Sequence, residues 1–174
     1  MFTFFCTSFC CPGISCCAIF RKNDDIHLHM CPFGNFSCVR LELQRDGFCQ
    51  NPFFECLVAE IPEELKSKEG FTVVGYALYF YTYSTWKGRS LYLEDLYVMP
   101  EFRGNGIGKG LLCKVAEVFK QCVRLQLSVL NWNTPSRDFY AAKGGQDLTV
   151  SEGWHFVRFD GQNLDNLAND APKI

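Results

Sequence analysis

The 174-residue chain has almost no net charge. Its 17 Lys and Arg residues nearly balance its 19 Asp and Glu residues, which leaves a formal charge of −2 and a sequence pI of about 5.9. The sequence therefore gives no sign of the basic surface that nucleic-acid-binding domains need. It also lacks an internal repeat and a recognisable linker. A chain of this length without either predicts one domain, large enough to bury about two-thirds of its unfolded surface.

The body of the chain has no C-x-x-C motif. Of the 11 cysteines, seven precede Val39, and the other four are scattered singly as Cys49, Cys56, Cys113 and Cys122. Isolated cysteines of this kind are typical of small buried thiols in a reducing compartment. The body thus predicts a cytoplasmic protein that needs no metal.

The first 20 residues contain no charged side chain. They lack the basic start of a signal peptide, and Pro12-Gly13 interrupts a run of about the length of a membrane span. Three interpretations stay open. We favour an irregular segment, such as an atypical gene model would give. The others are a membrane-associated or palmitoylated anchor, and a metal or disulfide cluster that uses His27, His29 and Cys31.

Three strands are predicted between residues 53 and 98. Their runs, rich in β-branched and aromatic residues, are Phe53–Glu60, Thr72–Tyr83 and Leu91–Val98. The polar loop Ile61–Gly70 and the turn Ser84–Arg89 separate them. Connections this short predict an antiparallel meander.

A helix is predicted from about Gly106 to Cys122, followed by a short strand from Arg124 to Val129. The apolar positions of the helix repeat at helical spacing. They are Ile107, Leu111, Leu112, Val115, Phe119 and Cys122. The strand, helix and strand predict a right-handed crossover whose ligand binds at the loop before the helix.

The last part of the chain predicts two further helices and a strand. Asn133 is expected to cap the first helix, with Pro135 in its first turn and Gly144-Gly145 at its end. A strand around Trp154–Asp160 and a short helix over Gln162–Asn169 follow. These elements complete an α/β domain.

A glycine-rich loop stands where the main helix begins. It supplies Arg103 and three glycines at alternate positions, the first of them Gly104. Such glycines let backbone N–H groups approach a ligand, and the helix N-terminus favours an anion such as a pyrophosphate. Two familiar nucleotide motifs do not fit, because Lys109 replaces the third glycine of G-x-G-x-x-G and Gly110 replaces the Ser or Thr of a P-loop. A glycine-rich turn with solvated cations is the alternative.

What fits is Arg-x-x-Gly-x-Gly, formed by Arg103, Gly106 and Gly108 after a strand that carries Leu-Glu-Asp. This pattern resembles the acetyl-CoA loop of the GNAT acyltransferase superfamily. The phrases LYLEDLYVMPEFRGNGIG, WNTPSRDFY and EGWHF are similar to the diamine acetyltransferases, and most like the thialysine N-epsilon-acetyltransferase (diamine acetyltransferase 2) branch. The resemblance covers roughly Leu41 to Ala168.

This resemblance implies a GNAT N-acetyltransferase domain over residues 41–170, with a mixed antiparallel and parallel central sheet flanked by helices. Residues 1–40 are then an atypical segment, rich in Cys and Phe, without family resemblance. The family also implies acetyl-CoA as cosubstrate, a small primary amine as acceptor and a homodimer, with no nucleic acid or membrane as partner.

Acetyl transfer to an amine requires three things: the amine must lose a proton, the oxyanion needs a hydrogen-bond donor, and the leaving thiolate needs a proton. The resemblance implies that Glu94 binds the amine and helps to deprotonate it, and that Tyr140 protonates the leaving thiolate. The residues alone leave other interpretations open, since Glu94 and Asp95 are also typical strand-surface acids and Tyr140 beside Phe139 is typical of core packing. Neighbours on a strand point to opposite faces, so only one acid can face the amine unless a bulge intervenes.

Two sets of binding residues follow from the resemblance. The cofactor set is Leu96, Tyr97, Val98, Arg103, Gly104, Asn105, Gly106, Ile107, Gly108, Lys109, Asn133 and Ser136. The substrate set is Ser84, Glu94, Asp95, Gln126, Leu127, Ser128 and Val129. The backbone N–H groups of residues 96–98 are the expected oxyanion donors.

Ser84 bears on the choice of amine. Polyamine-preferring relatives carry an acid at the matching position, which would attract a second ammonium. Ser84 therefore favours a lysine-like amine such as thialysine over spermidine. Two other functions stay open: a CoA-binding remnant without turnover, because the family's N-terminal strand and helices have no counterpart before Leu41, and a membrane-tethered protein that carries the domain as cargo.

Overall fold

The structure is a computed structural model that describes residues 3–6, 19–22, 25–28, 42–43, 45–47, 49–118, 122–170 and 172, with side chains from residue 42 on except at 118. The chain forms two compact units, the sheet unit Met1–Ser128 and the helical unit Val129–Ile174. The predicted cluster of His27, His29 and Cys31 and the predicted anchor lie outside the described side chains. Within the described part, no helix has both the length and the apolar character that crossing a membrane requires.

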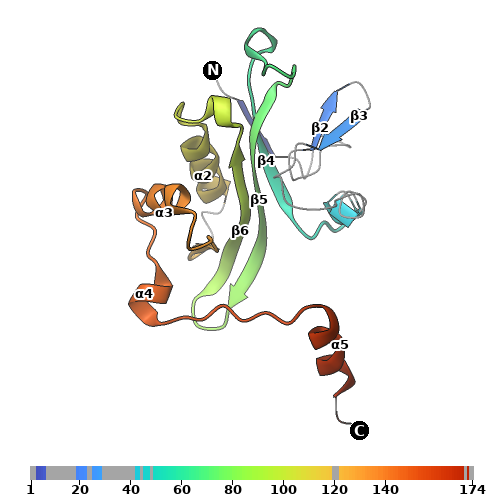
Figure 1. The fold of residues 1–174 in the computed structure, drawn as a ribbon, viewed down its shortest axis with the longest axis vertical. Helices are drawn as coiled ribbons and strands as arrows, with labels where there is room; N and C mark the ends of the chain where they lie inside the picture. The colour runs from blue at the N-terminus through green and yellow to red at the C-terminus, as the bar shows by residue number, and fades with distance from the viewer. Residues whose placement is uncertain are drawn as a thin grey trace. The chain divides into compact units, whose positions relative to one another are not determined.

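The sheet unit is built on a five-stranded sheet in the order β1-β4-β5-β6-β7 (Figure 1). The strands are β1 Thr3–Cys6, β4 Glu55–Glu60, β5 Val73–Ser84, β6 Gly88–Val98 and β7 Leu125–Leu127. Neighbours from β1 to β6 pair antiparallel, and β7 pairs parallel to β6. A separate two-stranded sheet joins β2 Ile19–Lys22 to β3 Asp25–Leu28. The predicted meander and the predicted mixed sheet are both confirmed.

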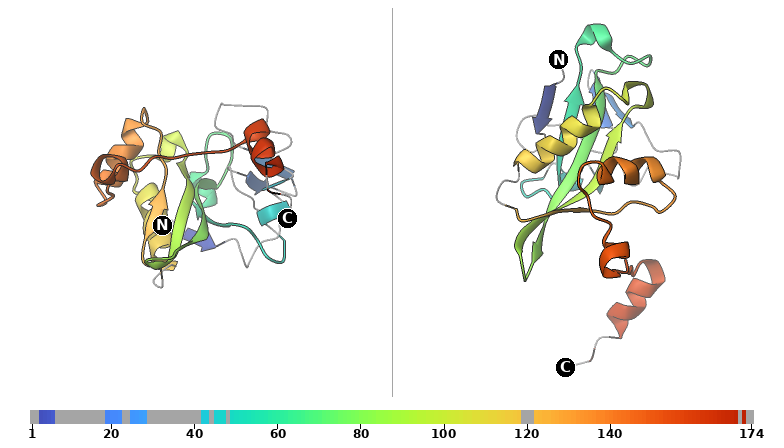
Figure 2. Two further views of the ribbon diagram at one scale, coloured as in Figure 1. Left: turned by 90° about the horizontal axis from the view of Figure 1, so that it is seen from below. Right: turned by 90° about the vertical axis from the view of Figure 1, so that its left-hand side faces the viewer.

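Helix α2, Ile107–Val118, packs on one face of this sheet against β4, β5 and β6 (Figure 2). It buries Leu111 and Val115 completely, as the helical spacing predicts, while Leu91 and Leu93 of β6 are buried below it. Each such side chain contributes about 1.5–3 kcal/mol of transfer free energy. The amphipathic pattern of α2 thus fixes which face of the sheet the helix covers.

Gly75 lets two strands and the helix come close together. A Cβ atom there would stand 2.8 Å from the Tyr97 carbonyl oxygen and 3.4 Å from Leu111 Cδ1. Real Cβ atoms do not approach a backbone oxygen so closely, so a larger side chain at Gly75 must push β6 away. The glycine therefore sets the spacing of β5 and β6 next to the strand end that leads into the glycine loop.

The opposite face carries a second apolar cluster. Its buried members are Cys56, Val58, Tyr76 and Leu78, with Phe54, Phe71, Val73, Phe80 and Tyr97 packed against them. The expectation of small buried thiols is wrong for the body of the chain. Cys56 is buried but disulfide-bonded, whereas Cys49 and Cys113 are free but exposed, one in the segment before β4 and one on the solvent side of α2.

The helical unit contains α3 Thr134–Ala141, α4 Leu148–Glu152 and α5 Gly161–Asn169. Asn133 caps α3 as predicted, and α5 matches its prediction within one residue. The predicted strand over Trp154–Asp160 is wrong, because the structure assigns these residues to no strand. An extended segment becomes a strand only when a neighbour supplies the hydrogen bonds of a ladder.

Candidate functional site

The glycine loop joins the end of β6 to the start of α2. After β6, the 3-10 turn η2 (Pro100–Phe102) redirects the chain, and Gly104 and Gly106 both take φ of +82°, which other residues rarely adopt. The first ladder bond of α2 runs from the Gly110 N–H to the Gly106 carbonyl at 2.9 Å. The N–H groups of residues 107–109 therefore precede the ladder and form the positive end of the helix dipole, a setting suited to an anion.

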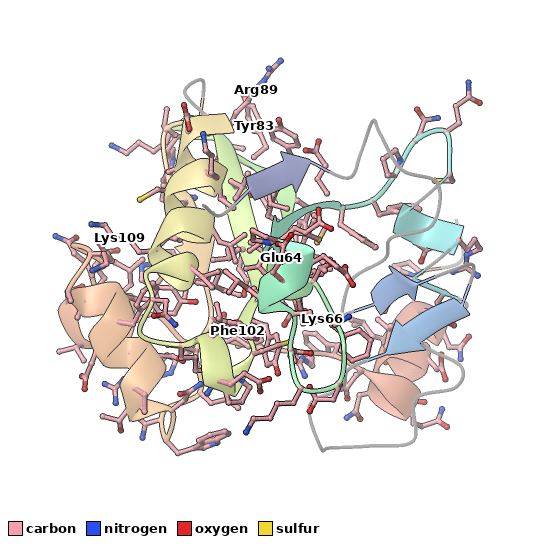
Figure 3. The ribbon with its side chains drawn as sticks, turned by 90° about the horizontal axis from the view of Figure 1, so that it is seen from above. Glu64, Lys66, Tyr83, Arg89, Phe102 and Lys109 are labelled. Atoms are coloured by element: carbon pink, nitrogen blue, oxygen red, sulfur yellow. The ribbon has the colours of Figure 1, made fainter. Side chains whose placement is uncertain are left out.

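The cations of the loop have different surroundings. Arg103 Nε donates to the Val98 carbonyl at 2.8 Å, and the guanidinium carbon lies 5.8 Å from the centre of the Tyr97 ring. Asn105 Nδ2 donates to the Phe102 carbonyl at 3.2 Å. Lys109 projects from the first turn of α2 and is exposed (Figure 3). Arg103 thus ties the loop to the strand end, while Lys109 adds positive charge at the helix start.

A β-bulge lies at the predicted catalytic carboxylate. Leu78 of β5 is opposite Asp95, but Tyr79 is opposite Leu93, so Glu94 is the extra residue of β6. The bulge breaks the strict alternation of side chains, so the two acids are not forced onto opposite faces. Glu94 is exposed and Asp95 is half-buried. Both predicted acids are thus placed at one irregularity of the strand.

Beyond the bulge, one edge of β6 is open. The Met99 N–H donates to the Val74 carbonyl at 2.8 Å, and an antiparallel ladder alternates, so Leu96 and Val98 direct their backbone groups away from β5. On that side the register of β7 with β6 ends at Leu93, and no described residue continues it past the bulge. An extended ligand arm fits such an edge as an added strand would.

Tyr97 differs from its two neighbours on this strand segment. By the same alternation its backbone pairs with β5, opposite Tyr76. Its ring lies 5.7 Å from the Tyr76 ring and beneath the Arg103 guanidinium. Within residues 96–98, the outward N–H groups are therefore those of Leu96 and Val98.

The end of β7 carries the predicted substrate residues Gln126, Leu127 and Ser128. Gln126 is opposite Tyr92 in the parallel register. The Ser128 hydroxyl lies 2.6 Å from the Tyr92 hydroxyl, across the strand pair. Val129, the last residue of the predicted set, begins the helical unit.

Ser84 closes the hairpin between β5 and β6. Its hydroxyl accepts a hydrogen bond from the Lys87 N–H at 3.2 Å, and its side chain is buried. It lies on the same face of β5 as Leu78, six residues away, which is about 20 Å along a strand. Because Leu78 is opposite Asp95, an amine a few bonds long that binds at the bulge does not reach Ser84 of the same chain.

The remaining predicted site residues lie on α3. Asn133 Oδ1 accepts a hydrogen bond from the Ser136 N–H at 3.4 Å, so these two residues form one helix cap. The Tyr140 ring packs edge-on against Phe139 at 5.3 Å, and the Tyr140 carbonyl accepts a bond from the Gly145 N–H at 3.0 Å. The structure thus gathers Glu94, Asp95, the glycine loop and the β7 end in the sheet unit, and Asn133, Ser136 and Tyr140 in the helical unit.

Sequence reasoning missed Tyr92. A signal for it exists, because Tyr92 alternates with the buried Leu91 and Leu93 and so must face away from α2, two residues before Glu94. Its partner Ser128 stands 36 positions later in the chain. The residue pattern of a single strand cannot predict a hydrogen bond to a residue so far away in the sequence.

A family model, curated relatives and solved structures all match this chain to acetyltransferases or to their fold. A model of the acetyltransferase (GNAT) family matches residues 25–144. The chain is 54% identical over 128 residues to a thialysine N-epsilon-acetyltransferase of Bos taurus, which covers 72% of this chain and 75% of that protein. It is 40% identical over 129 residues to spermidine/spermine N(1)-acetyltransferase-like protein 1 of Homo sapiens, covering 73% of this chain and 18% of the relative. An integron cassette protein of V. cholerae shares the fold, with a TM-score of 0.63, 24% identity and 76% of each chain covered.

Proposed function

The chain belongs to the acetyltransferase (GNAT) family, and we propose that it transfers the acetyl group of acetyl-CoA to a primary amine of a small molecule. Its type is that of the thialysine N-epsilon-acetyltransferases. One observation carries the proposal: the Glu94 bulge lies where the pairing of β6 and β7 ends. The same strand edge then leads directly into the glycine loop. An amine site and an anion site thus stand at two ends of one open edge.

The cofactor follows that edge in our proposal. The N–H groups at the start of α2 hold the pyrophosphate, with Lys109 adding charge. The outward N–H groups of Leu96 and Val98 and the Leu96 carbonyl pair with the pantetheine arm, because the Val98 carbonyl already accepts a hydrogen bond from Arg103. Asn133 and Ser136 bind a further part of the same cofactor. The open edge and the left-handed glycines support this arrangement, because both leave backbone groups accessible to a ligand.

The proposed reaction is direct attack of the amine on the thioester. Glu94, through water, takes the proton that the ammonium must lose before its nitrogen lone pair is available. The nitrogen forms a bond to the acetyl carbon, and outward N–H groups of β6 donate to the oxyanion. The nitrogen then gives its second proton to solvent and the carbon–sulfur bond breaks. The Tyr140 hydroxyl gives its proton to the leaving thiolate and is reprotonated from solvent. No covalent enzyme intermediate is needed.

The amine in this proposal is a thialysine-like amino acid, with a polyamine as the alternative. Glu94 and Asp95 supply two carboxylates at one point of the strand, which is enough to hold one ammonium group. Ser84 does not help to decide between these two amines if the amine is short, because Ser84 lies far along β5 from the bulge. The polyamine alternative keeps support from the spermidine/spermine relative.

A homodimer in the cytoplasm completes the proposal. The segment Trp154–Asp160 is exposed and rich in large apolar residues, but it has no strand partner in the described structure. A segment of that kind favours pairing with a sheet edge, as a dimer would provide. Sedimentation of the purified chain measures the oligomeric state directly.

The test is a panel of amines. Purified protein is mixed with acetyl-CoA and thialysine, lysine or spermidine, and the released CoA thiol is measured, while calorimetry gives the affinity for acetyl-CoA. We expect binding and thiol release, fastest with thialysine. Binding without release for every amine would show a CoA-binding remnant, and no binding would refute the cofactor site.

A further inference from the structure

We propose that Tyr92 is a positioning residue for acetyl transfer and that it acts through its hydrogen bond to Ser128. The inference rests on the proposed function. It concerns the place where the amine and the thioester meet, and it assigns a role to a residue outside the predicted binding sets. Three observations support it: the bond itself, the face on which Tyr92 lies, and the place where the pairing of β6 and β7 ends.

The bond is short and supported by packing. The two hydroxyl oxygens are 2.6 Å apart, within the usual range for O–H···O bonds. Tyr92 is opposite Gln126 in the register, so the bond runs diagonally to the residue two positions further along β7. The Tyr92 ring stacks on Phe80, with ring centres 5.4 Å apart and planes at 27°. The stacking holds the ring in place, so the hydroxyl has a defined position.

Tyr92 lies on the same face of the sheet as Asp95. Its neighbours Leu91 and Leu93 are buried on the α2 side, so Tyr92 points to the other face. Its cross-strand partner Phe80 shares that face with Leu78, two residues earlier, and Leu78 is opposite Asp95. Tyr92 and Asp95 therefore share one face, with the extra residue Glu94 between them.

The tie matters because of where the pairing of β6 and β7 ends. Two backbone bonds, from the Leu91 N–H to the Arg124 carbonyl and from the Val123 N–H to the Arg89 carbonyl, precede three register pairs, and the register ends at Leu93 with Leu127. Ser128 is the next residue, and its hydroxyl is held by Tyr92. This bond therefore fixes the end of β7 at the point where the edge of β6 opens. In the proposed reaction the thioester enters at that opening and the amine arrives from Glu94, so the bond sets the separation of the two reactants.

The test uses conservative variants of both partners. Tyr92→Phe keeps the stacked ring and removes the hydroxyl, and Ser128→Ala removes the other hydroxyl. Ser128→Thr keeps a hydroxyl and serves as the rescue variant. Tyr83→Phe is the matched control, because Tyr83 is an exposed tyrosine on the neighbouring strand and lies by Arg89, away from the bulge (Figure 3).

We expect Tyr92→Phe and Ser128→Ala each to lower kcat/KM for the amine about 2- to 10-fold, the range for a single net hydrogen bond. The double variant should be no worse than either single one, since both remove the same bond. The acetyl-CoA KM should not change. Ser128→Thr should lose less kcat/KM than Ser128→Ala, and Tyr83→Phe should keep wild-type kcat/KM. Unaltered kcat/KM in Tyr92→Phe, or losses that multiply in the double variant, would overturn the inference.

A loss of thermal midpoint with unaltered kcat/KM would also overturn it, because the bond would then be structural only. The two proposals fail in different ways. If the wild type acetylates no amine, the proposed function fails and this inference with it. If the wild type is active and Tyr92→Phe is equally active, only the positioning role fails.

Discussion

Replacing Arg103 by Lys should weaken acetyl-CoA binding about as much as replacing it by Ala. Both contacts of the guanidinium are made to the end of β6: the 2.8 Å bond to the Val98 carbonyl and the position over the Tyr97 ring. A lysine keeps the charge but has neither the planar fork nor the stacking surface. If Arg103 acts by holding the glycine loop, its geometry matters more than its charge.

The size of the effect follows from these two contacts. The side chain is exposed, so the hydrogen bond contributes about 0.5–1.5 kcal/mol and the ring contact about 0.5–1 kcal/mol. Losing both contacts removes about 1–2.5 kcal/mol of the free energy that holds the loop in place, which corresponds to about a 5- to 70-fold loss of affinity if the bound loop must take this conformation.

Calorimetry of acetyl-CoA binding at two salt concentrations tests this reasoning for wild type, Arg103→Lys and Arg103→Ala. The two variants should lose similar affinity, and the salt dependence of binding should change little. Lys109→Ala is the control, because Lys109 is exposed at the helix start and its loss should flatten the salt dependence. An Arg103→Lys variant with wild-type affinity would refute the positioning argument and show that charge alone matters.

Four further predictions follow from named contacts. Gly75→Ala should lower stability by about 1–3 kcal/mol, because its Cβ meets the Tyr97 carbonyl; urea unfolding checks this, and an unchanged midpoint would contradict it. Gly106→Val should weaken acetyl-CoA binding, since valine resists φ of +82°; wild-type affinity by calorimetry would refute it. Tyr140→Phe should lower kcat by about 10²–10⁴ with unchanged cofactor affinity, and a wild-type kcat would leave Tyr140 a packing residue. The hydrogen bond from Arg45 lowers the pKa of Asp46, so this pair stabilises the fold above the usual carboxyl pKa and that contribution is lost as pH falls through the lowered pKa; NMR titration of Arg45→Ala should show the Asp46 pKa rising, and an unchanged value would contradict it.

The sequence predicted those elements whose pattern is local. The spacing of Ile107, Leu111 and Val115 gave α2 and its buried face, and the Asn133 cap and Pro135 gave the start of α3. The turn residues between β5 and β6 predicted the hairpin, whose turn ends at Gly88 with φ of +101°. These features depend on residues within a few positions of one another, so the local sequence is enough to predict them.

The features that were missed depend on two distant segments. The bulge at Glu94 is a property of the register between β5 and β6, and alternation along one strand does not reveal it. The segment Trp154–Asp160 is rich in aromatic residues, as strands often are, but a ladder also needs a partner edge. The Tyr92–Ser128 bond joins residues 36 positions apart.

The most direct test of the account is the amine kinetics of Glu94→Gln beside Asp95→Asn, measured by acetyl transfer with saturating acetyl-CoA. Glu94 is the exposed, inserted residue of the bulge, whereas Asp95 is half-buried and pairs opposite Leu78. Glu94→Gln should lower kcat/KM for the amine by about 10²–10⁴, with unchanged acetyl-CoA affinity. Asp95→Asn should have the smaller effect. A Glu94→Gln variant with wild-type kcat/KM would contradict the proposed site.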